Sequence, residues 1–355
     1  MDIQVIKTQH SRVGETDFEN LGFGEVFSDH MFCMEYKNNE WTSPQIIPFG
    51  RIGIFPSMCS LHYGQVVFEG LKAFNTKKGI HVFRPEKYHE RLNKSCHRLC
   101  IPEIEYEAFI EALTELLKLD QKWVSGKKGN SLYIRPFIFA TDNFLGVKIS
   151  TTYRFMIITS PVGAYYAEGF NPIRLVTSGN YVRATKGGLG AAKTPANYAA
   201  SLLPAEEAKH NGFSQVLWLD GIEKKYIEES GAMNVFFFMD DELVTPSLES
   251  CILEGVTRNT VIHLARESGV HVSERRISID EVLSASKDGR LKEVFGTGTA
   301  AVISPVGAIR HNDILISIND GKTGALAQKL YDDITSIHYG DKENDNDFGW
   351  RHWIT

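Results

Sequence analysis

Long apolar runs are missing from this sequence, and no stretch approaches the about 18 consecutive apolar residues that cross a membrane as a helix. Cysteine is scarce too: the five cysteines are odd in number and scattered, a usage typical of a reducing compartment. No histidine, cysteine and acidic residues have the spacing of a zinc site. Met1 to Val5 lack the basic region and apolar core of a secretory signal. We therefore expect a cytoplasmic protein with neither a membrane span nor a metal centre.

An excess of positive charge is also missing. The 355 residues carry 38 lysines and arginines against 44 acidic residues, a formal net charge of −6. This charge argues against nucleic acid or an anionic membrane as a partner. Apolar residues make up 43% and charged residues 23% of the chain, as in soluble globular proteins. The length is enough for two domains of ordinary size.

From residue 31 onward, apolar periodicity and turn residues predict short strands and amphipathic helices, whereas the polar lead-in, residues 1–30, has no clear period. One helix begins at Pro85, where a helix tolerates proline, and Tyr88 and Leu92 give it an apolar face. The other predicted helices are 106–122, 202–211, 257–268, 279–286 and 322–339, and the predicted strands are 31–35, 46–55, 66–68, 80–83, 131–141, 153–159, 173–176, 213–219, 225–229, 234–239 and 293–295.

A break in this pattern divides the chain. Gly169, Asn171 and Pro172 fall together and mark a linker, which we place at residues 168–174. The predicted domains are therefore residues 1–167 and residues 175–355. Near the end of the second, Trp350 and Trp353 are expected to pack back onto the body of the protein.

The most informative stretch is the Gly- and Ala-rich segment 186–198, with Lys193 in its middle. Small residues let a backbone pass close to another group and leave the lysine without bulky neighbours. A lysine in a confined, partly dry space loses some preference for its charged form. Its amine is then a nucleophile that forms Schiff bases with aldehydes. The alternative is a solvated charge on a loop.

Two arginines are candidates for ligand binding. Arg91 lies one turn from Tyr88 on the helix that begins at Pro85, near the buried edge of that helix. On the predicted strand 131–141, Arg135 shares a face with Tyr133, since residues two apart on a strand point the same way. In both cases the alternative is a solvated arginine.

These segments together resemble the branched-chain amino acid aminotransferases, which belong to the fold type IV pyridoxal-phosphate enzymes. The residues around Lys193 are similar to the family's cofactor-lysine segment, and Ser60 to Phe74 to its N-terminal signature. The likeness runs in the right order from about residue 20 to the end, through segments 83–85, 131–136, 161–165, 215–219, 228–234 and 293–300. It implies a two-domain α+β fold of the D-amino acid aminotransferase-like type. The cofactor then lies at the domain interface, and the C-terminal domain carries the lysine.

The implied cofactor is pyridoxal 5′-phosphate, bound to Lys193 as a Schiff base. The family residue that matches Arg91 binds the cofactor phosphate, and the one that matches Glu229 pairs with the ring nitrogen and keeps the ring protonated. Without the resemblance, the ordinary interpretation of Glu229 is a surface glutamate before a glycine turn. The remaining cofactor-binding residues are Tyr198 at the phenolic oxygen and Val256, Thr257 and Thr299 at the phosphate.

The implied reaction is the reversible transfer of the amino group of L-leucine, L-isoleucine or L-valine to 2-oxoglutarate, giving branched 2-oxo acids and L-glutamate with ping-pong kinetics. Thr299 and Ala300 match a turn that holds the α-carboxylate, and Arg135 suits the second carboxylate of glutamate. The other matching substrate residues are Tyr63, Phe68, Tyr133 and Tyr165. The implied partners are small amino acids and 2-oxo acids, together with a second subunit whose residues complete the active site of a homodimer.

Other interpretations stay open: another pyridoxal-phosphate enzyme, such as a D-amino acid aminotransferase or an aminodeoxychorismate lyase, or a non-catalytic protein with this fold. A nicotinamide-dependent dehydrogenase is a third, because Gly296 to Ala301 fits Gly-x-Gly-x-x-Ala, although Val302 to Pro305 does not continue as an amphipathic helix. The chain departs from some mammalian members of the family at two places. Ala301 and Ser304 replace a Cys-x-x-Cys pair, and Ala232 replaces a threonine.

Overall fold

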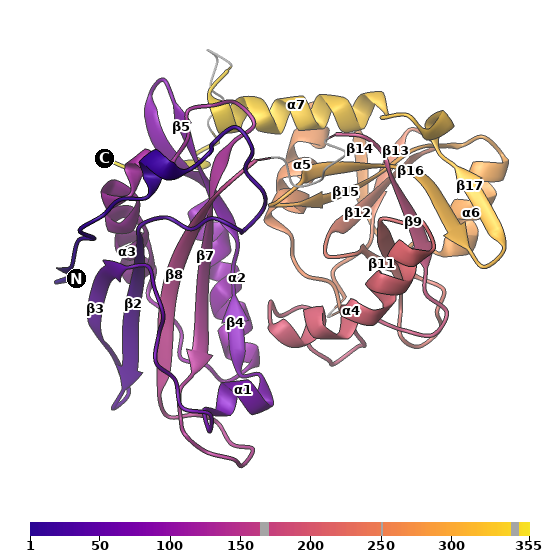
Figure 1. Ribbon diagram of the computed structural model, residues 1–355. Coiled ribbons are helices and arrows are strands. Elements are labelled where there is room, and N and C mark those ends of the chain that lie inside the picture. Colours follow the sequence, from indigo (N-terminus) through magenta and orange to yellow (C-terminus); the bar gives the residue numbers. More distant parts are fainter. Residues whose placement is uncertain (164–169, 250, 342–347) are drawn as a thin grey trace. The chain divides into compact units, whose positions relative to one another are not determined.

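A computed structural model describes residues 1–163, 170–249, 251–341 and 348–355. They form two compact units, each with its own β-sheet (Figure 1). The first unit comprises Met1–Tyr165, Ala192–Pro195 and Ile337–Thr355, and the second comprises Tyr166–Ala191 and Ala196–Ser336. Two segments that the sequence prediction placed in the C-terminal domain, 192–195 and 337–355, thus belong to the first unit. The linker at 168–174 stays a prediction, because residues 164–169 lie outside the described ones.

The sheet of the first unit has nine strands among the described residues, in the order β1-β3-β2-β8-β7-β5-β6-β18, with β4 beside β7. Its strands are β1 (Gln4–Val5), β2 (His30–Lys37), β3 (Glu40–Pro48), β4 (Val66–Phe68), β5 (Leu71–Thr76), β6 (Gly79–Phe83), β7 (Ser131–Ala140), β8 (Tyr153–Val162) and β18 (Arg351–Trp353). Strand β18 pairs with β6, and Trp350 packs on Phe83 with ring centroids 5.9 Å apart. These contacts tie the C-terminal tail to the first unit and confirm the predicted return of Trp350 and Trp353.

Amphipathic helices pack against this sheet because each has one apolar face. These helices are α2 (Pro85–Arg98) and α3 (Tyr106–Leu119), and a short helix, α1 (Cys59–Tyr63), precedes β4. On α3, Phe109, Leu113 and Leu116 are fully buried, and the Phe109 ring lies 6.4 Å from the ring of Phe155 on β8. Burial of side chains of this size contributes roughly 1.5–3 kcal/mol each. The predicted starts of α2 and α3 are confirmed.

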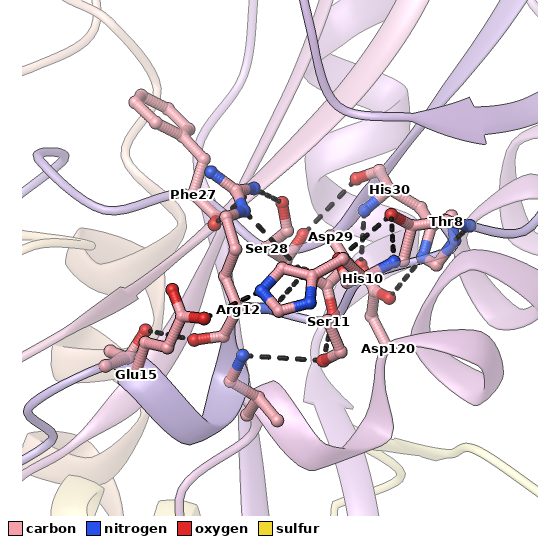
Figure 2. A network of polar contacts seen from close by, with 12 residues as sticks. Thr8, His10, Ser11, Arg12, Glu15, Phe27, Ser28, Asp29, His30 and Asp120 are labelled. Atoms are coloured by element: carbon pink, nitrogen blue, oxygen red, sulfur yellow. Dashed lines mark hydrogen bonds and ion pairs between the residues drawn. The ribbon is translucent and has the colours of Figure 1, made fainter.

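A polar network fixes the N-terminal segment to the first unit (Figure 2). The Arg12 backbone N–H donates to Asp29 at 3.0 Å, and the Thr8 N–H donates to Nε2 of His30 at 2.9 Å. The other ring nitrogen of His30 lies 2.6 Å from Asp120. Burial acts to raise the pKa of Asp29, but the N–H of Arg12 and neighbouring donors outweigh it, so this pKa is lowered. The lead-in, which shows no periodicity in sequence, is therefore ordered by hydrogen bonds.

The second unit contains the other nine-stranded sheet among the described residues, in the order β11-β10-β9-β16-β15-β12-β13-β14, with β17 beside β16. Its strands are β9 (Ile173–Thr177), β10 (Gln215–Leu219), β11 (Ile227–Ser230), β12 (Asn234–Met239), β13 (Glu242–Thr245), β14 (His271–Glu274), β15 (Leu291–Gly298), β16 (Val302–His311) and β17 (Ile314–Ser317). The helices are α4 (Pro195–His210), α5 (Val256–Glu267), α6 (Ile279–Lys287) and α7 (Ala325–Tyr339), of which α4 starts and α7 ends with residues of the first unit.

The glycine turn at the end of β15 joins two strands. Strands β15 and β16 are antiparallel, with Gly298 opposite Val302. A dinucleotide fingerprint needs a helix at this position, because the helix N-terminus holds the pyrophosphate. The turn leads into a strand instead, so the dinucleotide interpretation is wrong.

Candidate active site

Lys193 lies in the first unit, held by backbone contacts on both sides. Its N–H donates to Oγ of Ser95 on α2 at 2.9 Å, and its carbonyl accepts the N–H of Phe68 on β4 at 3.1 Å. The next residue, Thr194, donates its hydroxyl to the carbonyl of Val66 at 2.8 Å. These bonds explain why this segment joins the first unit. The side chain of Lys193 is partly buried, and its Nζ lies 5.0 Å from the centroid of the Phe68 ring.

The small residues ahead of the lysine serve close packing, as the sequence predicts. A Cβ on Gly190 would lie 2.1 Å from the carbonyl oxygen of Cys251 and 2.6 Å from Cβ of Ala184, both in the second unit. A Cβ on Gly188 would lie 2.9 Å from the carbonyl oxygen of Thr185. Any larger residue at Gly190 would therefore force the backbone of Cys251 aside.

Arg91 is buried on α2, with 7% of its surface exposed. Its Nε and Nη2 each lie 2.8 Å from a carboxylate oxygen of Glu69, in the bidentate arrangement of the strongest arginine–carboxylate pairs. The guanidinium also lies 5.3 Å from the Tyr88 ring centroid. The prediction that Arg91 lies at the buried edge of its helix is confirmed, and the solvated alternative is wrong.

Arg135 lies between aromatic rings. Its Nη2 donates to the Tyr133 hydroxyl at 2.9 Å, and its guanidinium lies 4.8 Å from the centroid of the Phe68 ring. Nζ of Lys193 lies against the same ring. The Phe68 ring therefore contacts both Lys193, the predicted cofactor lysine, and Arg135, the predicted substrate arginine. Tyr63 lies at the end of α1 and donates its hydroxyl to the carbonyl of Leu145 at 2.5 Å. Tyr165 lies outside the described residues.

The second unit holds the predicted carboxylate. Glu229, on β11, is buried and accepts the N–H of Leu253 at 2.9 Å, and its other oxygen lies 3.4 Å from Nε of Arg183. Arg183 is buried too and also donates to the carbonyl of Cys251. A carboxylate next to a cation and a backbone donor is stabilised in its charged form. The surface alternative for Glu229 is therefore wrong.

Glu228 precedes Glu229 and is equally buried, but its surroundings differ. Burial raises the pKa of the Glu228 carboxyl to about 7, while the guanidinium of Arg183 acts in the opposite direction. Within the described residues, Oε2 of Glu228 has no hydrogen-bond partner. Glu229, by contrast, has the ion pair with Arg183 and the backbone donor from Leu253.

The other predicted residues of the second unit lie at a helix start, at a turn and on a helix. Gly255 caps α5, and a Cβ there would lie 1.9 Å from Oδ1 of Asn234, so the tight entry to the helix requires glycine. Val256 and Thr257 form the first turn, where backbone N–H groups have no partner within the helix. Thr299 and Ala300 form the turn between β15 and β16, and Tyr198 is partly buried on α4.

Comparison with known proteins identifies the family. The model of a family described as "Amino-transferase class IV" matches residues 66–309, well over half of the chain. The chain belongs to the class IV aminotransferases. Branched-chain-amino-acid aminotransferase 2 of Bacillus subtilis (strain 168) is 54% identical over 336 residues, which cover 94% of this chain and 92% of that protein. This class IV chain therefore lies among the branched-chain-amino-acid aminotransferases.

Solved structures of class IV enzymes have the same fold. The branched-chain amino acid aminotransferase of Escherichia coli superposes with a TM-score of 0.77 at 29% identity, covering 92% of this chain and 99% of that one. The branched-chain amino acid aminotransferase of T.th., complexed with N-(5′-phosphopyridoxyl)-L-glutamate, gives a TM-score of 0.73 at 28% identity, with coverage of 91% and 98%. The α+β fold type IV prediction is thus confirmed.

Two buried charged residues of this class IV chain escape sequence reasoning. Glu69 carries a weak signal, a lone acid between the apolar strands β4 and β5. Arg183 carries none, because its partner Glu229 is distant in the sequence.

Among the described residues, no three His, Cys, Asp or Glu side chains are grouped so that they could hold a metal ion. In the same part of the chain, every helix is too short or too polar to span a membrane.

Proposed function

We propose that this chain is a branched-chain amino acid aminotransferase that transfers the amino group of L-leucine, L-isoleucine or L-valine to 2-oxoglutarate, giving branched 2-oxo acids and L-glutamate. The observation that carries this proposal is the 54% identity with a Bacillus subtilis branched-chain-amino-acid aminotransferase over nearly the whole of both chains. A D-amino acid aminotransferase or a lyase of the same fold is the rival that a substrate assay must exclude.

The residues present fit pyridoxal 5′-phosphate, the cofactor of class IV aminotransferases. When bound, this cofactor supplies an aldehyde carbon and a protonated ring that accepts an electron pair. The chain offers a partly buried amine at Lys193, a buried guanidinium at Arg91, and a buried carboxylate with its own ion pair at Glu229. These are the groups that an aldehyde, a phosphate and a ring nitrogen each require.

We assign one task to each of these residues. Lys193 binds the cofactor covalently through Nζ, and Glu229 keeps the ring nitrogen protonated. Arg91 supplies the cation for the phosphate, because a guanidinium suits phosphate geometry. The N–H groups and hydroxyls of Val256, Thr257 and Thr299 bind the same phosphate, and Tyr198 donates to the phenolic oxygen.

Lys193 is also the proton carrier of the reaction. With the cofactor and an amino acid bound, the amine of Lys193 would remove the Cα proton of the substrate and later return a proton. The N–H and the carbonyl of Lys193 are hydrogen-bonded to Ser95 and Phe68. The side chain can therefore bind or release the cofactor while the backbone stays in place. The donor amino acid leaves as a 2-oxo acid before 2-oxoglutarate, the acceptor, enters and leaves as L-glutamate, which gives ping-pong kinetics.

The substrate pocket combines apolar rings with one cation. The Phe68 and Tyr133 rings border the substrate side chain, and Arg135, which lies against both rings, binds the second carboxylate when glutamate occupies the site. Thr299 and Ala300 hold the α-carboxylate. The remaining wall residues that we assign are Tyr63 and Tyr165.

The test is an amino-transfer assay. With 2-oxoglutarate as acceptor, we expect glutamate formation from L-leucine, L-isoleucine and L-valine. D-alanine serves as the control donor and should give no product. Transfer from D-alanine without transfer from the three L-amino acids would keep the fold but overturn the substrate assignment.

We also propose a homodimer whose partner subunit completes the active site. Two segments of the first unit lie together, since Phe144 N–H donates to the carbonyl of Ser57 at 3.0 Å and Tyr63 donates to Leu145. The exposed apolar side chains of these segments are Ile52, Ile54, Phe55, Leu61, Phe144, Leu145, Val147 and Ile149. Apolar patches of this kind mark interaction surfaces. The occupant that we propose is a second copy, because Tyr63, a proposed substrate residue that is itself exposed, donates its hydroxyl to Leu145 of this patch.

Val147→Asp is expected to weaken that dimer. The side chain is 85% exposed, so the new charge costs the isolated subunit little, while burying it against a partner without a counter-charge is unfavourable. The dissociation constant of the dimer, measured by analytical ultracentrifugation, should rise about tenfold or more. Ile222→Asp, at a position of the second unit that is 77% exposed, is the matched control and should leave the constant unchanged. A monomeric wild-type enzyme with full activity would contradict the dimer.

The cellular location that we propose is the cytoplasm. Cys33, Cys59, Cys96 and Cys100 are free thiols, and the first three of them are at least partly buried. This usage is compatible with a reducing compartment.

A further inference from the structure

A buried carboxylate in the first unit is not used by any of the tasks assigned above. Glu69 follows β4, and none of its surface is exposed. A buried carboxylate is costly unless it is paired and hydrogen-bonded. Its position next to Phe68, and its partner Arg91, connect it with the proposed cofactor site.

Every oxygen of this carboxylate has a partner. Oε1 accepts from Nε of Arg91 at 2.8 Å, and Oε2 accepts from Nη2 of Arg91 at 2.8 Å and from the N–H of Gly70 at 3.1 Å. The Glu69 N–H itself donates to the carbonyl of Pro136 on β7 at 2.7 Å. Because a guanidinium is planar, two parallel bonds to one carboxylate fix its plane as well as its position.

The same contacts form a closed ring with the lysine. Ser95, one turn after Arg91 on α2, donates its hydroxyl to the carbonyl of Arg91 at 2.9 Å and accepts the N–H of Lys193 at 2.9 Å. The carbonyl of Lys193 accepts the N–H of Phe68, and Glu69, the next residue, returns to the side chain of Arg91. Five residues from three separate segments of the chain are thus held in one hydrogen-bonded frame.

We propose that Glu69 is a positioning residue that orients the guanidinium of Arg91 toward the phosphate of the cofactor and holds it at a fixed distance from the backbone of Lys193. This inference rests on the proposed function, in which Arg91 binds that phosphate. We assign the carboxylate no contact with the cofactor, since both of its oxygens are bonded to Arg91. Its effect is to keep a buried, rotatable side chain in one orientation, so that phosphate binding does not have to order it.

The test compares two ligands that differ only in the phosphate. Pyridoxal 5′-phosphate and pyridoxal are each titrated into the apo full-length protein, and the dissociation constants are obtained from absorption spectra. Glu69→Gln, which keeps the shape but removes the charge, should raise the constant for pyridoxal 5′-phosphate about 10- to 100-fold. The constant for pyridoxal should stay within about twofold, because the amine of Lys193 is unchanged.

A matched control is available in the same unit. Glu35 on β2 accepts from Arg154 on β8, with Nη2 at 2.6 Å and Nε at 2.7 Å from one oxygen, and it plays no part in the proposed site. Glu35→Gln should leave both dissociation constants unchanged. Glu69→Asp keeps the charge but shortens the reach. It should give the same phosphate-dependent loss as Glu69→Gln, and it replaces that variant if the glutamine protein does not fold.

The Arg91→Gln variant separates this inference from the proposed function. Arg91→Gln should weaken the binding of pyridoxal 5′-phosphate but not that of pyridoxal. Adding Glu69→Gln to this variant should cause no further loss of affinity, since both substitutions act through one guanidinium. Glu69 is only a structural partner of Arg91 if Arg91→Gln weakens the binding of pyridoxal 5′-phosphate and Glu69→Gln does not. The same conclusion follows if Glu69→Gln weakens the binding of both ligands equally. If Arg91→Gln itself leaves both ligands unaffected, the phosphate assignment of Arg91 fails.

Discussion

Replacing Lys193 by alanine is expected to abolish transamination of L-leucine. The variant loses the group that binds the cofactor and the base that removes the Cα proton. A positioned base alone contributes about 10²- to 10⁴-fold, so the rate of glutamate formation from leucine and 2-oxoglutarate should fall by at least about 10³-fold. The fold should survive, because the segment is anchored by the backbone of Lys193 and by the Thr194 hydroxyl, neither of which the substitution removes.

Lys186→Ala is the matched control for this experiment. Lys186 lies in the same glycine-rich segment, but it is exposed, and we assign it no task. Its replacement should leave the rate of glutamate formation unchanged. A Lys193→Ala protein that transaminates leucine at the wild-type rate would remove the basis of the proposed mechanism.

Replacing Glu229 by glutamine is the second change with a large expected effect. The amide oxygen can still accept the N–H of Leu253, which now lies 2.9 Å from Oε1, so the local backbone should hold. An amide, however, does not keep the ring nitrogen of the cofactor protonated, so the ring accepts electrons less readily. We expect kcat to fall about 100- to 1,000-fold, with a much smaller change in KM, because the carboxylate acts on the reaction rather than on substrate binding.

Glu223→Gln is the control for that prediction. Glu223 lies in the loop that joins β10 and β11, is exposed, and pairs with Arg276 at 3.3 Å. Steady-state kinetics with leucine should give wild-type values for this variant. Wild-type kcat in Glu229→Gln would show that the carboxylate does not bind the ring nitrogen.

Local patterns of the sequence predicted most of the fold. The helices α2 and α3 begin where Pro85 and Tyr106 predict, and their apolar residues are buried, because a period of about 3.6 residues decides which face packs. Tyr133 and Arg135 lie in contact on β7, as alternation along a strand requires. Helix α5 begins at Val256, one residue before the predicted start at 257.

The bounds of two elements and one buried ion pair were not predicted in this way. Strand β3 runs from Glu40 to Pro48 and accommodates Pro44, whereas the sequence predicted a strand at 46–55. Helix α4 begins at Pro195, seven residues before the predicted start at 202, since proline is tolerated in the first turn. The ion pair between Arg91 and Glu69 joins residues 22 positions apart and has no periodic signature.

The most direct test of the central claim is the near-ultraviolet and visible absorption of the purified protein, recorded before and after L-leucine is added. We expect a band from the lysine-bound cofactor, which leucine replaces with the band of the amine form; this single change would establish the cofactor and the first half of the reaction. A band that D-alanine moves and leucine does not would contradict the assigned substrate. No band at all, even after pyridoxal 5′-phosphate is added, would contradict the assignment of Lys193.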